Sequence, residues 1–257
     1  MQKSQINVEK KILLISANQH KVPYPVYPLG LAYISSYLKE NSPEYEIRIF
    51  DFNLNDLSDF KKELEEFAPR YVGISLRNAD SANSLNPSNF IEDYSPLVEL
   101  VKEYGKSITV VGGAGYSIFP KLIYELLSPD FGIYGEGEVS FRDLIETIDQ
   151  GQFNFNDIDG LIYRTNGQVA LNKKKRFGEG IKLQYDESAI EYYWQQSGTL
   201  NIQTKRGCPY QCVYCSYPLI EGSQVRTLDA DKIVDSLAHL YHEKNINYVF
   251  FTDRCLT

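Results

Sequence analysis

The sequence predicts an α/β protein whose first 150 residues form a doubly wound parallel sheet with helices on both faces. Two observations support this fold class. Short apolar runs typical of buried strands alternate with segments that have the helical spacing of apolar residues. The chain has 257 residues, 43% of them hydrophobic, which is enough for a large buried core. Strand–helix units in series fold into a parallel sheet because each helix crosses over to the next strand.

The expected elements form five such units. The first strand, "KILLISA", is a short apolar run, and the helix after it places Leu31, Ile34 and Leu38 on one side. Pro96 lies within the third expected helix, so this helix should kink or begin late. The layout is flavodoxin-like or Rossmann-like, and ligands of such sheets bind outside the carboxyl ends of the strands. The expected strands cover residues 11–17, 45–52, 71–76, 107–113 and 131–138, and the expected helices cover residues 29–40, 57–68, 89–105, 119–127 and 138–149.

The pattern changes after residue 150. "DGLIYRTNGQVALN" at 159–172 predicts a hairpin, because Asn-Gly is a favoured two-residue turn between alternating strands. A linker follows, and a second unit begins near Thr199 with a strand and a cysteine-rich segment. This unit continues with a helix at 229–245 and a strand at 247–253. We therefore divide the chain into a first domain at 1–150, a hairpin and linker at 151–198, and a second domain at 199–257.

Composition argues against nucleic acid and membranes as partners. The net charge is −8 and the pI is about 5.0, and no basic stripe is available to neutralise phosphates. The one basic run, "NKKKRF" at 172–177, is interpreted as a solvated loop. Neither a signal peptide nor an apolar stretch of membrane-spanning length is recognisable. We therefore expect a cytoplasmic protein, and in such a reducing compartment clustered cysteines more often indicate metal binding than disulfides.

Glycines and polar residues follow the expected strands. The loop at 77–90 is long and polar, which is typical of functional or disordered loops. "GGAGYS" after the fourth strand allows a ligand to approach the backbone closely, because glycine has no side chain. Its glycines, Gly112, Gly113 and Gly115, lack the G-x-G-x-x-G spacing of a dinucleotide site. Tight turning from strand to helix accounts for them as well as ligand binding does.

Three of the four cysteines lie within eight residues, at Cys208, Cys212 and Cys215. Structural zinc normally takes four N or S ligands. Cys255 is a candidate fourth ligand, whereas His239 and His242 lie in the body of an expected amphipathic helix and are read as ordinary helix residues. Three thiolates can instead hold three irons of a cubane iron–sulfur cluster and leave one iron open. An open coordination position is what distinguishes a catalytic metal site from a structural one.

The segment "TKRGCPYQCVYCSYP" resembles the radical S-adenosylmethionine (radical SAM) enzymes. The resemblance implies a 4Fe-4S cluster held by the three clustered cysteines, with SAM bound to the open iron. An electron from the cluster, supplied by a donor such as flavodoxin or ferredoxin, would cleave SAM into methionine and a 5'-deoxyadenosyl radical. By the same resemblance Tyr214 packs near the adenine, and Thr252 and Asp253 lie near the methionine of SAM. The second domain would then be the first part of a partial TIM barrel.

The first domain resembles the cobalamin-binding domain that precedes the barrel in one radical SAM subfamily. The resemblance rests on "YPLGLAYISSYL", "GISLRN", "VVGGAGYSIFP" and "YGEGE", and it implies cobalamin over the carboxyl ends of the strands. His20 falls where other cobalamin domains place a cobalt-ligating histidine, but the Asp and Gly of their Asp-x-His-x-x-Gly motif are missing, so we expect a loop histidine. The residues implied in cobalamin binding are Ser75, Gly112, Gly113, Gly115, Gly135 and Gly137.

Radical SAM barrels normally have about six strand–helix units, and this chain supplies one unit and a further strand. We therefore expect a fragment, a truncated gene, or a split enzyme whose barrel a second chain completes. The expected activity is methyl transfer from cobalamin to an unactivated carbon of a small molecule, with ring closure or another radical rearrangement as an alternative outcome. Three rival hypotheses stay open: a first domain that binds substrate or partner instead of cobalamin, a non-catalytic zinc module that uses Cys255, and an inactive remnant. Cys255 is otherwise read as a half-buried structural thiol.

Overall fold

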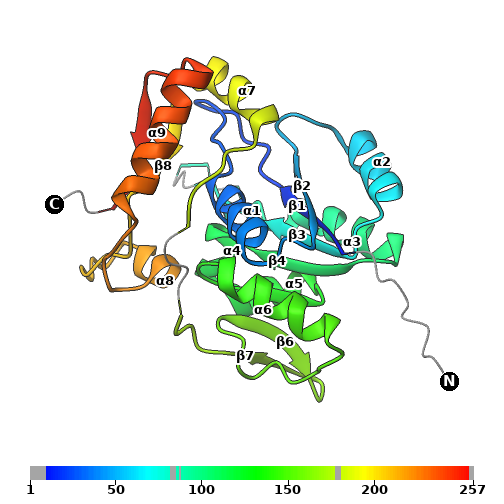
Figure 1. The fold of residues 1–257 in the computed structure, drawn as a ribbon. Coiled ribbons are helices and arrows are strands. Elements are labelled where there is room, and N and C mark those ends of the chain that lie inside the picture. The colour runs from blue at the N-terminus through cyan, green and yellow to red at the C-terminus, as the bar shows by residue number, and fades with distance from the viewer. Residues whose placement is uncertain (1–9, 82–84, 87, 177–180, 255–257) are drawn as a thin grey trace.

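A mostly parallel seven-stranded sheet forms the centre of the molecule, with two small two-stranded sheets beside it (Figure 1). The computed structural model describes residues 10–81, 85–86, 88–176 and 181–254. The strand order of the large sheet is β2-β1-β3-β4-β5-β6-β7. Its parallel part has the flavodoxin-like order, so the predicted fold class is confirmed.

The parallel part of the sheet contains each strand expected from the sequence. These strands are β1 (Lys11–Ser16), β2 (Glu46–Asp51), β3 (Tyr71–Ser75), β4 (Ile108–Gly112) and β5 (Phe131–Ile133). The helices that follow them are α1 (Leu29–Asn41), α2 (Leu57–Phe67), α3 (Ser95–Tyr104), α4 (Ala114–Ile118), α5 (Pro120–Leu127) and α6 (Glu138–Asp149). Helix α3 begins late, as expected: a 3-10 turn at Glu92–Tyr94 precedes it, and Pro96 lies in its first turn, where a missing N–H costs no hydrogen bond.

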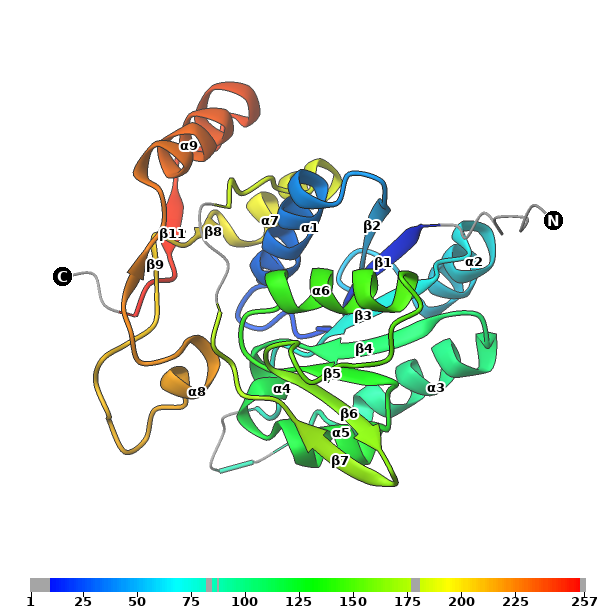
Figure 2. The ribbon, with the colours of Figure 1, turned by 60° about the horizontal axis from the view of Figure 1, so that its bottom comes forward.

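Alternate side chains of the strands supply two separate cores. Leu13 and Ile15 of β1 pack toward the face covered by α2, α3 and α5. Ile12 and Leu14 of the same strand pack toward the opposite face, which α1 and α6 cover. Figure 2 shows α1 and α6 on one side of the sheet and α3 and α5 on the other. Because the strands are apolar on both faces, helices must cover both.

A hairpin extends the sheet beyond β5. Its strands are β6 (Leu161–Thr165) and β7 (Gln168–Leu171), and β6 pairs antiparallel with β5. The predicted Asn-Gly turn is present, with φ of 48° at Asn166 and 78° at Gly167. The sequence pattern grouped this hairpin with the linker, but its pairing makes it part of the first domain's sheet.

The last part of the chain forms a second unit beside the carboxyl ends of the parallel strands (Figure 1). Strands β8 (Leu200–Ile202) and β11 (Val249–Phe251) pair in parallel across α9 (Ala230–Lys244), which is the βαβ arrangement expected. Between β8 and α9 lie β9 (Lys205–Arg206), α8 (Tyr217–Glu221) and β10 (Arg226–Thr227). Helix α7 (Glu187–Ser197), which precedes β8, was not predicted.

A third apolar cluster joins the second unit to α1. Tyr33 of α1 packs in it with Tyr193 of α7, Leu200 of β8 and Leu240 of α9. The two units therefore share an apolar core and are not connected by the linker alone.

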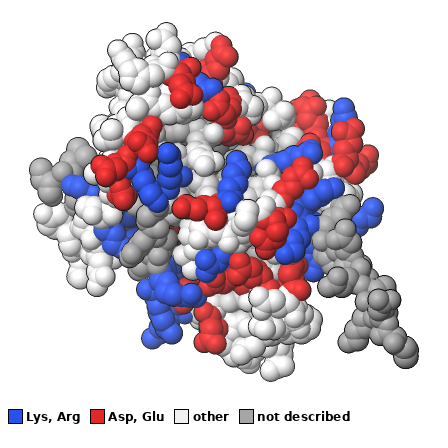
Figure 3. Space-filling model, in the orientation of Figure 1, with Lys and Arg blue, Asp and Glu red and all other residues white. Residues whose placement is uncertain are grey.

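The surface is of mixed charge. On the face shown in Figure 3, acidic and basic side chains are interspersed and neither sign dominates. Within the described residues, no helix combines the length and apolar character needed to cross a bilayer.

A buried hydrogen bond reinforces the contact between the sheet and α7. The hydroxyl of Tyr193 donates to Oδ2 of Asp51 at 2.6 Å and accepts from Nδ2 of Asn53 at 3.1 Å. Asp51 is 3% exposed. Burial raises the pKa of this carboxyl, and the hydrogen bond from Tyr193 opposes that rise.

Replacing Tyr193 by Phe should lower the free energy of unfolding by about 1–3 kcal/mol at neutral pH, because a buried carboxylate loses one of its hydrogen-bond donors. The loss should shrink as the pH falls toward 4, since protonation of Asp51 removes the charge that needs the donor. Urea unfolding at several pH values measures both effects. Tyr192→Phe, on the same helix, is the control and should change stability by less than about 0.5 kcal/mol. An equal loss at pH 4 and pH 7 would contradict the assignment to Asp51.

Candidate functional site

A cavity of about 310 Å³ lies at the carboxyl ends of the parallel strands, and we call it the sheet-end cavity. Its walls come from the ends of β1, β3, β4 and β5 and from the N-terminal turns of α1 and α6. The second unit closes it with Arg206, Tyr217, Ile220, Thr252 and Arg254. One hollow is therefore bordered both by the sheet and by the elements around the clustered cysteines.

Most residues implied in cobalamin binding line this cavity. Ser75, Gly112, Gly113, Gly135 and Gly137 are all in its wall. Gly113 has φ of 102°, and a Cβ there would lie 2.6 Å from the carbonyl oxygen of Leu76. Only glycine fits this turn, so the strand-to-helix connection itself requires Gly113.

Gly115 lies against the backbone of Asn78 and Ala79. It does not line the sheet-end cavity, and a Cβ there would lie 2.6 Å from the carbonyl carbon of Asn78. Its small size lets the backbone after β3 pass close to α4. Its assignment to cobalamin stays a prediction.

Two glutamates next to the cavity glycines supply buried negative charge to the site. Glu136 and Glu138 line the cavity and are both buried. Nη1 of Arg206 lies 3.1 Å from Oε2 of Glu136 and 2.8 Å from Oε1 of Glu138. Arg206 is 5% exposed, and its guanidinium lies 4.5 Å from the ring centroid of Tyr33. Burial would lower the pKa of Arg206, but the two carboxylates outweigh it and hold the pKa above its usual value.

A second arginine reaches the same carboxylate. Nη1 of Arg226 donates to Oε2 of Glu136 at 2.9 Å, and its Nη2 pairs with Oε1, which makes the contact bidentate. Arg206 and Arg226 are direct partners in the antiparallel pair β9–β10. The residues between them, 207–225, contain the clustered cysteines, and we call this segment the cysteine loop.

Glu221 adds a further tie at the start of the cysteine loop. Its Oε2 accepts from the backbone N of Gly207 at 3.1 Å, and its Oε1 accepts from Nε2 of Gln203 at 2.9 Å. The backbone N of Cys208 donates to the carbonyl of Gly222 at 3.1 Å. Burial raises the pKa of Glu221. The two ends of the loop are thus tied to each other as well as to Glu136.

Part of the basic run at 172–177 is used in the structure. Nζ of Lys174 donates to the carbonyl of Glu136 at 2.6 Å and to Oγ of Ser140 at 2.7 Å. Arg176 pairs with Asp143 and Asp159. These two side chains are therefore not simply solvated, in contrast to the sequence-based interpretation.

The three cysteines differ in exposure. Cys208 is buried, Cys215 is half-buried and Cys212 is exposed, and within the described residues none of them forms a disulfide. In the same part of the chain, no three His, Cys, Asp or Glu side chains lie close enough to hold a metal ion. Thiols on one loop remain the right donor set for an iron–sulfur cluster, and the cluster assignment stays a prediction.

The residues implied in SAM binding lie at different depths. Tyr214 is 89% exposed, and its neighbour Cys212 raises the pKa of Tyr214 through its charge and a hydrogen bond. Thr252 lines the sheet-end cavity, and its backbone N donates to Ile202 at 2.8 Å. Asp253 does not line it, because its Oδ1 accepts from the backbone N of Thr204 at 2.7 Å. The structure tests none of these roles.

The histidines lie in the loop after β1 and on α9. His20 is exposed, stacks on Phe90 with ring centroids 3.8 Å apart, and does not line the sheet-end cavity. His239 contacts Glu187 at 3.2 Å and Glu243 at 3.1 Å on the surface of α9. Cys255, the fourth ligand of the zinc hypothesis, lies outside the described residues.

The carboxylates in the cavity wall can accept hydrogen bonds from a ligand rich in donors, such as the side-chain amides of cobalamin. Glu138 lines the cavity, and its Oε2 is buried and has no hydrogen-bond partner among the described residues. A buried acceptor of this kind is usually satisfied by a ligand or an ordered water. The glycines and the carboxylates of Glu136 and Glu138 in the cavity wall are compatible with the group that the sequence implied.

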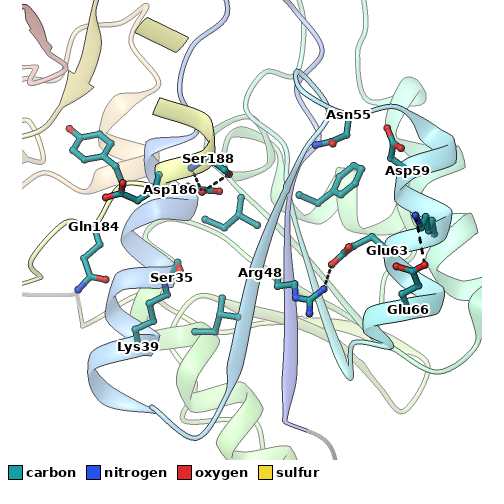
Figure 4. A pocket seen from close by; sticks show the side chains of 16 residues that line it. Ser35, Lys39, Arg48, Asn55, Asp59, Glu63, Glu66, Gln184, Asp186 and Ser188 are labelled. Atoms are coloured by element: carbon teal, nitrogen blue, oxygen red, sulfur yellow. Dashed lines mark hydrogen bonds and ion pairs between the residues drawn. The ribbon is translucent and has the colours of Figure 1, made fainter. Parts of the chain in front are cut away.

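A larger cavity of about 620 Å³ lies at the open edge of β2, between α1 and α2 (Figure 4). Four of its charged side chains pair with one another: Arg48 donates to Glu63 at 3.1 Å, and Lys62 lies 3.8 Å from Glu66. None of the site residues expected from the sequence lines it. We therefore place the candidate site at the sheet-end cavity.

The sequence model of the B12 binding domain family matches residues 15–145, about half of the chain. The chain belongs to this family. The matched region runs from the end of β1 through β5 and ends within α6, so it covers the strand ends that form most of the cavity wall.

Curated relatives match beyond that domain. An uncharacterized methyltransferase of Pyrococcus horikoshii is 28% identical over 261 residues, covering 96% of this chain and 54% of the relative. Tryptophan 2-C-methyltransferase of Streptomyces laurentii is 21% identical over 284 residues, covering 89% of this chain and 47% of the relative. The chain thus spans about half the length of the curated relatives it matches.

Solved structures show the same fold. The radical S-adenosylmethionine methyltransferase TsrM from Kitasatospora setae superimposes with a TM-score of 0.82 at 22% identity, over 95% of this chain and 48% of that one. The cobalamin-dependent S-adenosylmethionine radical enzyme OxsB gives a TM-score of 0.76 at 21% identity, over 95% of this chain and 34% of that one. The resemblance recognised in the sequence is confirmed for the B12-binding domain and for the fold.

Gly113→Ala should lower the free energy of unfolding by about 1–3 kcal/mol, because alanine is strained at this φ and its Cβ meets the Leu76 carbonyl. Urea unfolding measures the change. Gly30→Ala is the matched control: Gly30 also lines the cavity, but a Cβ there meets nothing within 4 Å. Equal stability of the two variants would show that the turn tolerates a side chain.

Proposed function

We propose that this chain is the cofactor-binding part of a cobalamin-dependent radical SAM methyltransferase that acts on an unactivated carbon of a small molecule. The observation that carries the proposal is the sheet-end cavity, because the carboxyl ends of a B12-binding sheet and residues next to the cysteine loop border the same hollow. A reaction that uses two cofactors on one substrate needs them at one site. The relatives from Pyrococcus horikoshii and Streptomyces laurentii and the structure of TsrM are all named as methyltransferases, which supports this proposal.

Different residues of the chain would bind the different cofactors. Ser75, Gly112, Gly113, Gly135 and Gly137 would hold cobalamin, since the glycines allow close approach and the loops end at the cavity. Cys208, Cys212 and Cys215 would hold the 4Fe-4S cluster, and Tyr214, Thr252 and Asp253 would contact SAM. When bound, cobalamin supplies a cobalt centre that carries a methyl group, and the cluster supplies the electron for SAM cleavage.

Buried groups around the cavity would limit access of water. Tyr33 is almost fully buried, and burial raises its pKa to about 12, so its hydroxyl stays protonated and donates to the carbonyl of Gln203. Arg206 keeps its charge for the reason given above. The open iron would be left to SAM because three thiols, and not four, occur in the loop. The partners that this function requires are a small-molecule substrate and an electron donor such as flavodoxin or ferredoxin.

Anaerobic reconstitution of the chain with iron, sulfide and hydroxocobalamin tests the proposal. About four iron atoms per chain should bind, as one 4Fe-4S cluster requires, together with one corrin seen by its absorbance. The variant with Cys208, Cys212 and Cys215 all changed to Ala should lose the iron and keep the corrin.

Cys255→Ala is the matched control, and it should keep the full iron content. One zinc per chain without iron, together with a loss of metal in Cys255→Ala, would instead support a zinc module. A chain that takes up the cluster but shows no corrin absorbance would remove cobalamin and leave the first domain as a substrate or partner module.

A further inference from the structure

The two arginines that flank the cysteine loop face a like charge across the β9–β10 pair. Arg206 and Arg226 are register partners. Like charges directly opposite each other destabilise a strand pair, and here both lie largely out of water. The base of the loop therefore needs a negative group between them.

Glu136 supplies that group from the first domain. Its carboxylate binds Nη1 of Arg206 at 3.1 Å and Nη1 of Arg226 at 2.9 Å. Glu136 lies outside the second unit, in the connection between β5 and α6, and it is 8% exposed. One side chain of the B12-binding domain thus joins both ends of the loop that carries Cys208, Cys212 and Cys215.

Glu136 also belongs to the wall of the sheet-end cavity, between Gly135 and Gly137. A molecule that fills the cavity will fix this connection and with it the carboxylate. Cys208 lies two residues after Arg206 and is itself buried. The path from cavity to thiol is therefore short and consists of charged contacts, which are more directional than apolar packing.

We propose that Glu136 is a positioning residue that holds the cysteine loop closed and couples occupation of the sheet-end cavity by cobalamin to the placement of Cys208. The coupling rests on the proposed function, because it requires cobalamin in this cavity. The closure of the loop by Glu136 does not. By linkage, the coupling also works in reverse, so an ordered cysteine loop tightens cobalamin binding by the same factor.

The accessibility of the thiols in the cofactor-free chain tests the closure. Iodoacetamide labelling, followed by mass spectrometry of each cysteine, should show Cys208 reacting about tenfold faster in Glu136→Gln than in the unaltered chain. Cys212 is already exposed and serves as the internal reference, with a change of less than about twofold. Glu187→Gln is the matched control, because Glu187 joins α7 to α9 through an exposed ion pair with Lys244. It should leave both rates unchanged.

A charge-specific rescue separates positioning from simple loss of packing. Removing one of the two like charges should relieve the repulsion, so Glu136→Gln combined with Arg226→Met should label at Cys208 more slowly than Glu136→Gln alone. If Glu136→Gln does not fold, Arg226→Met by itself takes its place. It removes one of the two attachments and should raise the Cys208 rate. No change at Cys208 in any of these variants would overturn the closure.

Labelling with and without hydroxocobalamin tests the coupling. Bound corrin should slow labelling of Cys208 about tenfold in the unaltered chain and less than about twofold in Glu136→Gln, within the usual range of coupling between sites. Corrin that binds without changing the Cys208 rate would overturn the coupling and leave cobalamin binding intact. A chain that binds no corrin would overturn both the coupling and the cobalamin part of the proposed function.

Discussion

The structure depends on one buried carboxylate held between two arginines. Glu136, from the sheet domain, accepts from Arg206 and Arg226 at the base of the cysteine loop. An ion pair shielded from water adds little net stability, because both charges lose their hydration. Removing one partner of a buried pair typically costs roughly 3–5 kcal/mol when it leaves the other charge unpaired. Without Glu136, Arg206 would keep Glu138 at 2.8 Å. The contact therefore fixes which surfaces meet more than how tightly the chain folds, and it brings the B12-binding sheet and the cysteine loop onto the same cavity.

The surrounding architecture makes this contact possible. The parallel strands all end at the same edge of the sheet, so loops distant in sequence converge there. The shared apolar cluster of α1, α7 and α9 holds the second unit against that edge, and the ring of Tyr33 in this cluster covers the guanidinium of Arg206. The hydrogen bond from Tyr193 to Asp51 ties α7 to the end of β2. Apolar packing thus excludes water from the charges, and the charges select the orientation.

Local sequence patterns predicted the helices and strands, whereas the contacts around the sheet-end cavity join residues that are far apart in the sequence. The apolar runs of β1, β3 and β4 and the Asn166–Gly167 turn are visible in a few residues each, so their structures were foreseen. Nothing in the hairpin sequence shows that β6 would pair with β5, because an edge strand accepts any suitable neighbour. Helix α7 was missed because its aromatic residues lack a clear apolar stripe. The segment "YGEGE" was selected for its glycines, whereas its Glu136 contacts Arg206 and Arg226, which lie 70 and 90 residues further along the chain. A single sequence does not reveal such long-range pairing.

Electron paramagnetic resonance tests the shared site most directly. The chain would be loaded with both cofactors and reduced until the cobalt and the iron–sulfur cluster each carry an unpaired electron. Because one cavity borders both binding regions, the two spins should interact, and the cobalt signal should be broadened or split relative to the chain with the three clustered cysteines replaced. A spectrum equal to the sum of two isolated signals would show that the two cofactors are far apart and would contradict the account.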